Sequence, residues 1–138
     1  MKIKTTKGEF VQLVNSLFSL KDLQGKEFAI VAAENLELIT KELQDVEEAG
    51  KPSKEFMDLA MSVNAFTSDP EEKDSKIYEI EKLEKENKEL IDERRDQLDA
   101  VAELMKAEIE IEVKPITYEM LPDTITAQQI ASLSKFIK

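Results

Sequence analysis

Residues 71–107 contain neither glycine nor proline, and this uninterrupted stretch constrains the fold more than any other feature of the sequence. Pro70 precedes it, where the fixed φ of proline suits the first turn of a helix, and Asp69 can cap that turn. We therefore predict one long charged helix over residues 70–107, on the order of 55 Å long at 1.5 Å per residue.

The apolar seam of this predicted helix is thin in its middle. Between Leu83 and Leu98, Asn87 and Arg94 stand where a coiled coil would place apolar side chains. The helix can pack on the rest of the domain, or its exposed part can meet a partner protein or a second copy of the chain. The sequence leaves both interpretations open, so homo-oligomerisation through the long helix is one prediction.

Two short segments alternate between apolar and charged residues, as strands with one buried face do. Residues 108–114 have acidic side chains on the solvent face, whereas residues 1–5 have Lys2 and Lys4 there. Opposite charges across a strand pair stabilise it by a few tenths of a kcal/mol up to ~1. We therefore predict that the N-terminal segment pairs with residues 108–114 in a small two-stranded sheet.

Helical periodicity fills most of the remaining chain. We expect a first helix to about residue 20, a second over residues 26–49, a third over residues 53–66 and a last one after residue 126. The sequence also predicts capping boxes of Thr6 with Glu9 and of Thr126 with Gln129, and a left-handed cap at Gly50. The predicted fold class is mainly α (α+β), with residues 1–138 forming a single domain.

The sequence contains no histidine and no cysteine. Imidazole bases, thiol nucleophiles and the usual ligands of zinc are therefore absent. Carboxylate pairs such as Glu34 with Glu37 and Asp92 with Asp96 fit solvated helix faces better than a catalytic site, which needs a concave setting. We predict no catalytic, cofactor-binding or metal-binding residues and no enzymatic activity. An enzyme with a carboxylate-held Mg²⁺ is the weaker alternative.

Other side chains are interpreted as packing residues. Tyr78 is expected to pack on a helix face, and core filling is expected for the methionines, although methionines can also form an adaptable binding surface. The four methionines concerned are Met57, Met61, Met105 and Met120.

The net charge of −11 is concentrated in the middle of the chain. Residues 34–112 include eleven basic and twenty-five acidic residues. Binding to nucleic acid or to an anionic membrane requires clustered lysine and arginine, so both are disfavoured. An acidic surface of this kind suits a host-directed inhibitor that binds the basic groove of a host nucleic-acid or defence enzyme.

The whole chain resembles a family of small uncharacterised phage proteins, a domain of unknown function. Members are encoded near the tail genes of phages with long, non-contractile tails. The matching residues are Met1-Lys2-Ile3-Lys4, Leu17-Phe18-Ser19-Leu20, residues 28–36, residues 108–116, Leu121-Pro122, Ile125-Thr126 and Phe136-Ile137. The resemblance implies a phage origin and a non-enzymatic role, and it supplies no functional residues.

From the residues and the resemblance together, we predict a phage-encoded interaction protein that is accessory to virion or tail assembly. Its expected partner is a phage structural protein or a host protein. Its expected location is the cytoplasm of the infected bacterial host, or the virion itself. The alternative is the acidic host-directed inhibitor described above.

Overall fold

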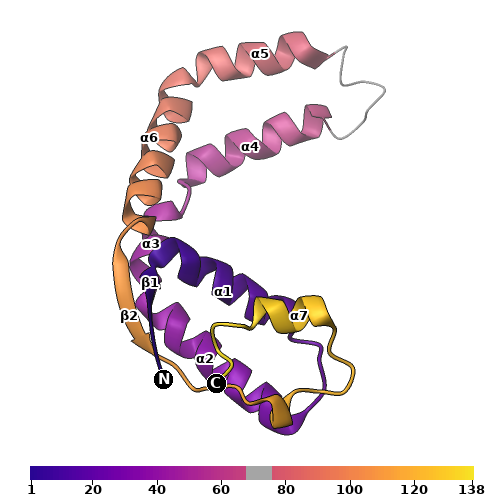
Figure 1. Ribbon diagram of the computed structural model, residues 1–138. Coiled ribbons are helices and arrows are strands. Elements are labelled where there is room, and N and C mark those ends of the chain that lie inside the picture. The colour runs from indigo at the N-terminus through magenta and orange to yellow at the C-terminus, as the bar shows by residue number, and fades with distance from the viewer. Residues whose placement is uncertain (68–75) are drawn as a thin grey trace. The chain divides into compact units, whose positions relative to one another are not determined.

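The computed structural model describes residues 1–67 and 76–138, which form a mainly helical α+β fold (Figure 1). This confirms the predicted fold class. The expected helix start at Asp69 and Pro70 lies outside the described residues. In chain order the elements are β1 (Lys2–Thr6), α1 (Lys7–Ser19), α2 (Lys26–Glu42), α3 (Gln44–Gly50), α4 (Lys54–Thr67), α5 (Ile77–Glu86), α6 (Lys88–Met105), β2 (Glu108–Glu112), the 3-10 turn η2 (Tyr118–Met120) and α7 (Ala127–Ser132).

The chain divides into two compact units, each of which is described by itself. Unit 1 comprises residues 1–47 and 103–138, and unit 2 comprises residues 48–102. The prediction that residues 1–138 form a single domain stays a prediction.

The two strands of unit 1 pair as the charge pattern predicts. β1 and β2 are antiparallel, with Lys2 opposite Glu112 and Lys4 opposite Glu110. The ammonium group of Lys2 lies 3.5 Å from the Glu110 carboxylate. Between the charged pairs, the buried side chain of Ile3 lies opposite that of Ile111. The sheet therefore has one charged face and one face in the core.

The core of unit 1 is formed by apolar side chains from α1, α2, α3, both strands and the C-terminal segment. Each large side chain of this kind stabilises the fold by roughly 1.5–3 kcal/mol when it is fully buried. The buried apolar residues of this unit are Ile3, Phe10, Leu13, Leu17, Leu20, Phe28, Ile39, Leu43, Val46, Ile111, Val113, Ile116, Leu133 and Phe136.

Asn35 on α2 is the one buried polar side chain among the described residues, and it is completely inaccessible to solvent. Its amide nitrogen donates a hydrogen bond to the Lys114 carbonyl at 2.8 Å, and its amide oxygen accepts one from the Lys114 N–H at 2.7 Å. The side chain thus satisfies both backbone groups of Lys114, the second residue after β2. Because buried polar groups need partners, this pair fixes the chain after β2 against α2.

The last residues of the chain extend this arrangement. The Ile116 N–H donates to the Phe136 carbonyl at 2.7 Å, and the Lys138 N–H donates to the Ile116 carbonyl at 3.1 Å. Upstream, Thr126 and Gln129 form the predicted capping box at the start of α7. The turn after this short helix places Leu133 and Phe136 in the core.

The start of α1 only partly follows the prediction. The Thr6 hydroxyl accepts a hydrogen bond from the Glu9 N–H at 3.2 Å, as expected of an N-cap. The Glu9 carboxylate, however, bonds to the Thr5 hydroxyl and the Lys135 ammonium group. The second half of the predicted capping box is therefore wrong, because a lysine from the C-terminal segment and a neighbouring hydroxyl bind this carboxylate.

The predicted helix over residues 26–49 is two helices, α2 and α3, separated at Leu43. Beyond the break, the Asp45 carboxylate accepts the Val46 N–H, and such side-chain bonds compete with the helical pattern. Gly50 lies within α3 without a positive φ, so the predicted left-handed cap is wrong. Among the described residues only Gly25, at the start of α2, has a positive φ, of 148°.

In unit 2, the described part of the expected long helix is also two helices. α5 ends before Asn87 and α6 begins after it, with a bend between them (Figure 1). The Asn87 side chain donates a hydrogen bond at 2.9 Å to the Leu83 carbonyl, which also accepts the Asn87 N–H. A side chain that bonds to the turn before it commonly bends a helix.

Two polar side chains of α6 bind the end of α3. Arg94 donates to the Gly50 carbonyl at 2.8 Å, and Gln97 donates to the Ala49 and Lys51 carbonyls at 2.8 and 2.7 Å. A cation at a helix C-terminus is favourable because the last carbonyls carry partial negative charge. Arg94, which interrupts the apolar seam in the sequence, thus has a structural role.

Three packing predictions for unit 2 are wrong. Met57 and Met61 on α4 are exposed, and Tyr78 on α5 is 74% exposed. The side of α4 that faces inward is instead centred on Leu59, which is buried.

We predict that Asn35→Ala lowers the free energy of unfolding by about 2–4 kcal/mol, since it removes two hydrogen bonds and leaves both partly buried backbone groups of Lys114 without this partner. Urea unfolding followed by circular dichroism measures this. The matched control is Asn15→Ala, at an exposed position of α1, for which we expect a change within about 0.5 kcal/mol. Equal effects of the two substitutions would contradict the role assigned to Asn35.

Candidate functional site

An apolar groove runs between α1 and α2 on the surface of unit 1. It consists of three adjoining hollows, with volumes of about 220, 790 and 250 Å³. Phe18 and Leu36 line both the first and the second hollow, and Val14 and Thr40 line both the second and the third. The hollows therefore form one continuous groove, which we call the α1–α2 groove.

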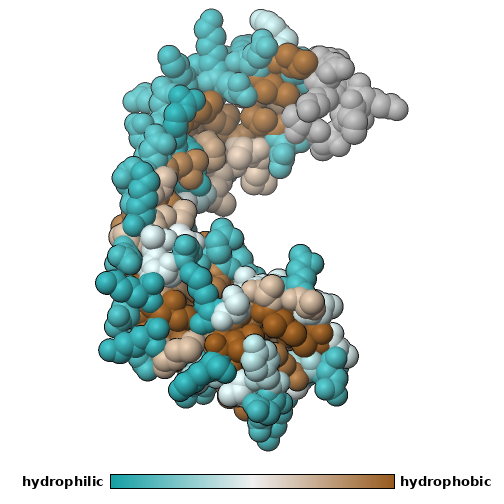
Figure 2. Space-filling view, in the orientation of Figure 1, coloured by the Kyte–Doolittle hydropathy of each residue, from teal (hydrophilic) through white to brown (hydrophobic). Residues whose placement is uncertain are grey.

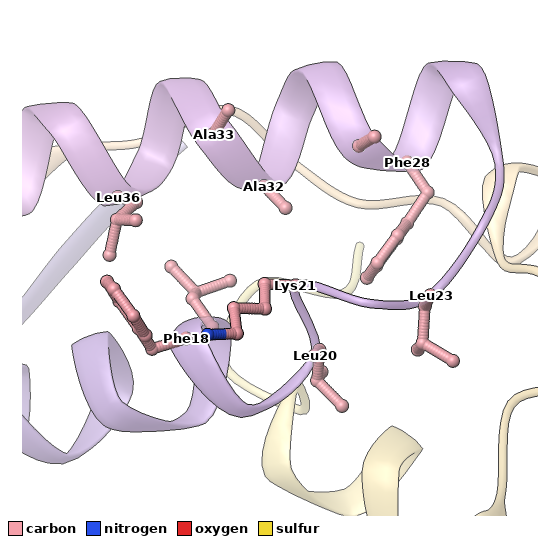
Figure 3. Close-up of a pocket in the computed structure, with 10 residues that line it drawn as sticks. Phe18, Leu20, Lys21, Leu23, Phe28, Ala32, Ala33 and Leu36 are labelled. Carbon is pink, nitrogen blue, oxygen red and sulfur yellow. The ribbon is translucent and has the colours of Figure 1, made fainter.

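Phe18 is the most exposed large apolar side chain of this groove, at 54%. Figure 3 shows it on α1, pointing toward Leu36 on α2, and the Lys21 ammonium group lies 5.3 Å from the centre of its ring. The helical spacing of α1 explains the exposure. The buried face passes through Phe10, Leu13 and Leu17, so the next residue in the chain is turned away from the core.

The walls of the groove are unusually poor in charge. No charged residue occurs between Glu9 and Lys21, although 36% of the residues in the chain are charged. On α2, Ala29, Ala32 and Ala33 leave space beside the phenylalanine. Figure 2 shows apolar atoms on the surface of unit 1 where α1 and α7 lie. Depletion of charge in the centre of a surface patch distinguishes protein interfaces from the rest of a protein surface.

Four charged side chains line the groove, and all four are exposed. Lys21 lies at the end near the α1–α2 turn, Glu37 and Lys41 lie beside the middle hollow, and Glu47 lies at the end near α3. None of them makes an ion pair with another residue in the described part of the chain.

Of the four carboxylates considered as acid–base candidates, only Glu37 lines the α1–α2 groove, and Asp92 and Asp96 line a separate, open hollow on the surface of α6. A carboxylate oxygen of Glu34 lies 3.3 Å from the ammonium nitrogen of Lys114, and a carboxylate oxygen of Asp92 lies 3.8 Å from a guanidinium nitrogen of Arg95. Within residues 1–67 and 76–138, no group of three or more acidic side chains is arranged to hold a metal ion. In the same ranges, no helix combines the length and the apolar character needed to cross a membrane.

The clearest pKa shifts in unit 1 mark structural ion pairs. A hydrogen bond from Lys135, helped by one from Thr5, lowers the pKa of Glu9 below its usual 4.5. A hydrogen bond from Lys7 lowers the pKa of Asp45 below its usual 3.8. These pairs connect α1 to the C-terminal segment and β1–α1 to α3, so they hold the elements that frame the groove.

No protein-family model matches this sequence, and neither a curated protein nor a solved structure does. The resemblance to small phage proteins therefore stays a prediction.

The sequence did not predict the groove because Phe18 shares the helical spacing of Phe10, Val14 and Leu17, so the pattern alone does not separate an exposed phenylalanine from a core residue. One signal of its exposure was available. Phe10, Leu13 and Leu17 already form a complete apolar stripe on the first helix, and Phe18 lies at the edge of that stripe. The run of uncharged residues before Lys21 was a second available signal.

We predict that unit 1 loses stability in acid through Glu9 and Asp45. Their pKa values are lowered in the folded state, so their contribution is fully present above 4.5 and 3.8 and is lost as the pH falls through the lowered values. Urea unfolding between pH 7 and pH 3 measures this loss.

The variant Lys7→Met/Lys135→Met should lose less stability between pH 5 and pH 3 than the parent, because its carboxylates no longer have their partners. Lys26→Met, which removes a lysine without an ion pair among the described residues, should leave the pH dependence unchanged. If the double variant keeps the parent's pH dependence, these two pairs are not its source.

Proposed function

We propose that this protein is a non-enzymatic interaction protein and that the α1–α2 groove is its binding site. The observation that carries the proposal is an exposed phenylalanine in a long, mainly apolar groove, on a chain in which 36% of the residues are charged. Apolar surface of this extent and continuity commonly marks a site of protein–protein contact. An apolar groove between two helices suits the apolar side of another helix.

The chemical inventory of the chain supports an interaction role over catalysis. The sequence supplies neither imidazole nor thiol. The groove is lined by apolar side chains, with its charged groups set along its edges. A catalytic carboxylate pair would instead need a concave site that separates the two pKa values.

The resemblance to small phage proteins supports the biological setting of the proposal. In that setting the protein is an accessory factor for virion or tail assembly, and it acts in the cytoplasm of the infected bacterial host or within the virion. The partner would be a phage structural protein or another copy of this chain. Mass spectrometry of purified particles and assembly intermediates of the encoding phage tests this part, and absence of the protein from both would count against it.

Site-directed photocrosslinking tests the binding site directly. A benzophenone amino acid at Phe18, in the full chain produced during infection, should form an adduct of defined mass, since its aromatic side chain lies in the groove. The same amino acid at Asp96, on the acidic surface of α6, should form none.

Substitution at Ala33 provides the matched control. Ala33→Arg fills the groove from an exposed position and should abolish the adduct, whereas Ala100→Arg, on the exposed surface of α6, should leave it intact. Failure of the benzophenone at position 18 to form any adduct contradicts the proposal. Adducts formed from position 96 alone would favour the acidic host-directed inhibitor.

A further inference from the structure

We infer that the occupant of the α1–α2 groove is a second copy of this chain, bound antiparallel about a two-fold axis. The inference rests on the proposed function, because the groove must first be an interaction surface. It adds the identity of the partner, which the groove's own charges indicate.

The four charged residues that line the groove alternate in sign from one end to the other. In spatial order they are Lys21, Glu37, Lys41 and Glu47. Reversing this order gives the opposite sign at every position. A groove laid antiparallel on an identical groove therefore places each cation opposite an anion, which is the self-complementarity that a two-fold interface requires.

The spacing along α2 agrees with this arrangement. Glu37 and Lys41 are one turn apart, so a two-fold axis over the groove midway between them places Glu37 of each copy opposite Lys41 of the other. The two end charges lie on either side of this axis. Lys21 lines the first hollow, and Glu47 on α3 lines the third.

The apolar residues between these charges would be covered in the same step. Phe18 and Leu36 lie near the centre of the groove, where they are flanked by Val14 and Ala33. In the two-fold arrangement the two phenylalanines flank the axis and lose their contact with water. Interfaces between identical chains are commonly apolar in the centre and charged at the rim.

The expected long helix is a weaker candidate for self-association. It is divided at Asn87 in the structure. On its described residues, the exposed large apolar side chains are Ile77, Tyr78 and Leu98, which lie on both sides of the bend and far apart in sequence. A helix pair needs a sustained apolar seam, and these residues do not provide one.

Charge reversal combined with sedimentation equilibrium tests the inference at an ionic strength of about 0.15 M, where a Debye length of ~8 Å screens the repulsion between two chains of net charge −11 but not close contacts across the interface. The parent chain should form dimers. Glu37→Lys and Lys41→Glu should each weaken self-association by about tenfold or more, because two attractive contacts become repulsive in each dimer. The double variant Glu37→Lys/Lys41→Glu should recover dimerisation.

Mixing the two single variants gives the sharpest result. One chain then has lysine at both positions and the other has glutamate at both, so the mixture should form a one-to-one heterodimer although each variant alone self-associates weakly. Ala33→Arg should abolish the dimer, and Ala100→Arg should not.

A parent chain that stays monomeric at 200 µM overturns the inference, as does a dimer that Glu37→Lys and Ala33→Arg leave unchanged. Neither result removes the proposed function, which fails only if the benzophenone at Phe18 forms no adduct. An adduct of Phe18 with another protein, together with a monomeric parent, supports the groove as a binding site and rejects the second copy as its occupant.

Discussion

The buried amide of Asn35 bonds to both backbone groups of Lys114, seventy-nine positions away in sequence, and this pairing connects α2 with the segment after β2. It fixes the second residue after β2 against α2, and we call this hydrogen-bonded arrangement of α2 and the segment after β2, with the core packed around it, the frame of unit 1. From there the neighbouring Ile116 receives the end of the chain through backbone hydrogen bonds. A buried amide without these partners would be destabilising. The pairing therefore also favours one register of the segment after β2 along α2 over registers shifted by one residue.

The groove exists because one side of α2 packs in the core while the side toward α1 is only partly covered. One side of the helix is occupied by Asn35 and Ile39, which face the core and the chain after β2. The side toward α1 is left with alanines and Leu36, which are too small to fill the space beside α1. Because hydrogen bonds and a packed core hold this frame, a partner of the proposed kind would meet a groove that is already ordered.

The sequence predicted those parts of the fold that depend on local patterns. Strand alternation with opposite charges predicted the pairing of β1 with β2, and Thr126 with Gln129 predicted the start of α7. The breaks at Leu43 and Asn87 were missed because single side chains there bond to the backbone against a strong helical periodicity. The position of Asn35 could not be predicted, since its partner is distant in sequence, and Phe18 was missed because an apolar residue at the edge of a stripe belongs equally to the core or to a surface.

The central claim is that a frame anchored at Asn35 holds the groove open in the free protein. Native-state hydrogen exchange, measured by NMR on the unliganded chain, tests this most directly. The amide of Lys114 and the amides of the central turns of α1 should have the same opening free energy, and this should equal the free energy of complete unfolding of unit 1. Exchange of the Lys114 amide at the rate of an unprotected residue, or of α1 well before the rest of the unit, would contradict the account.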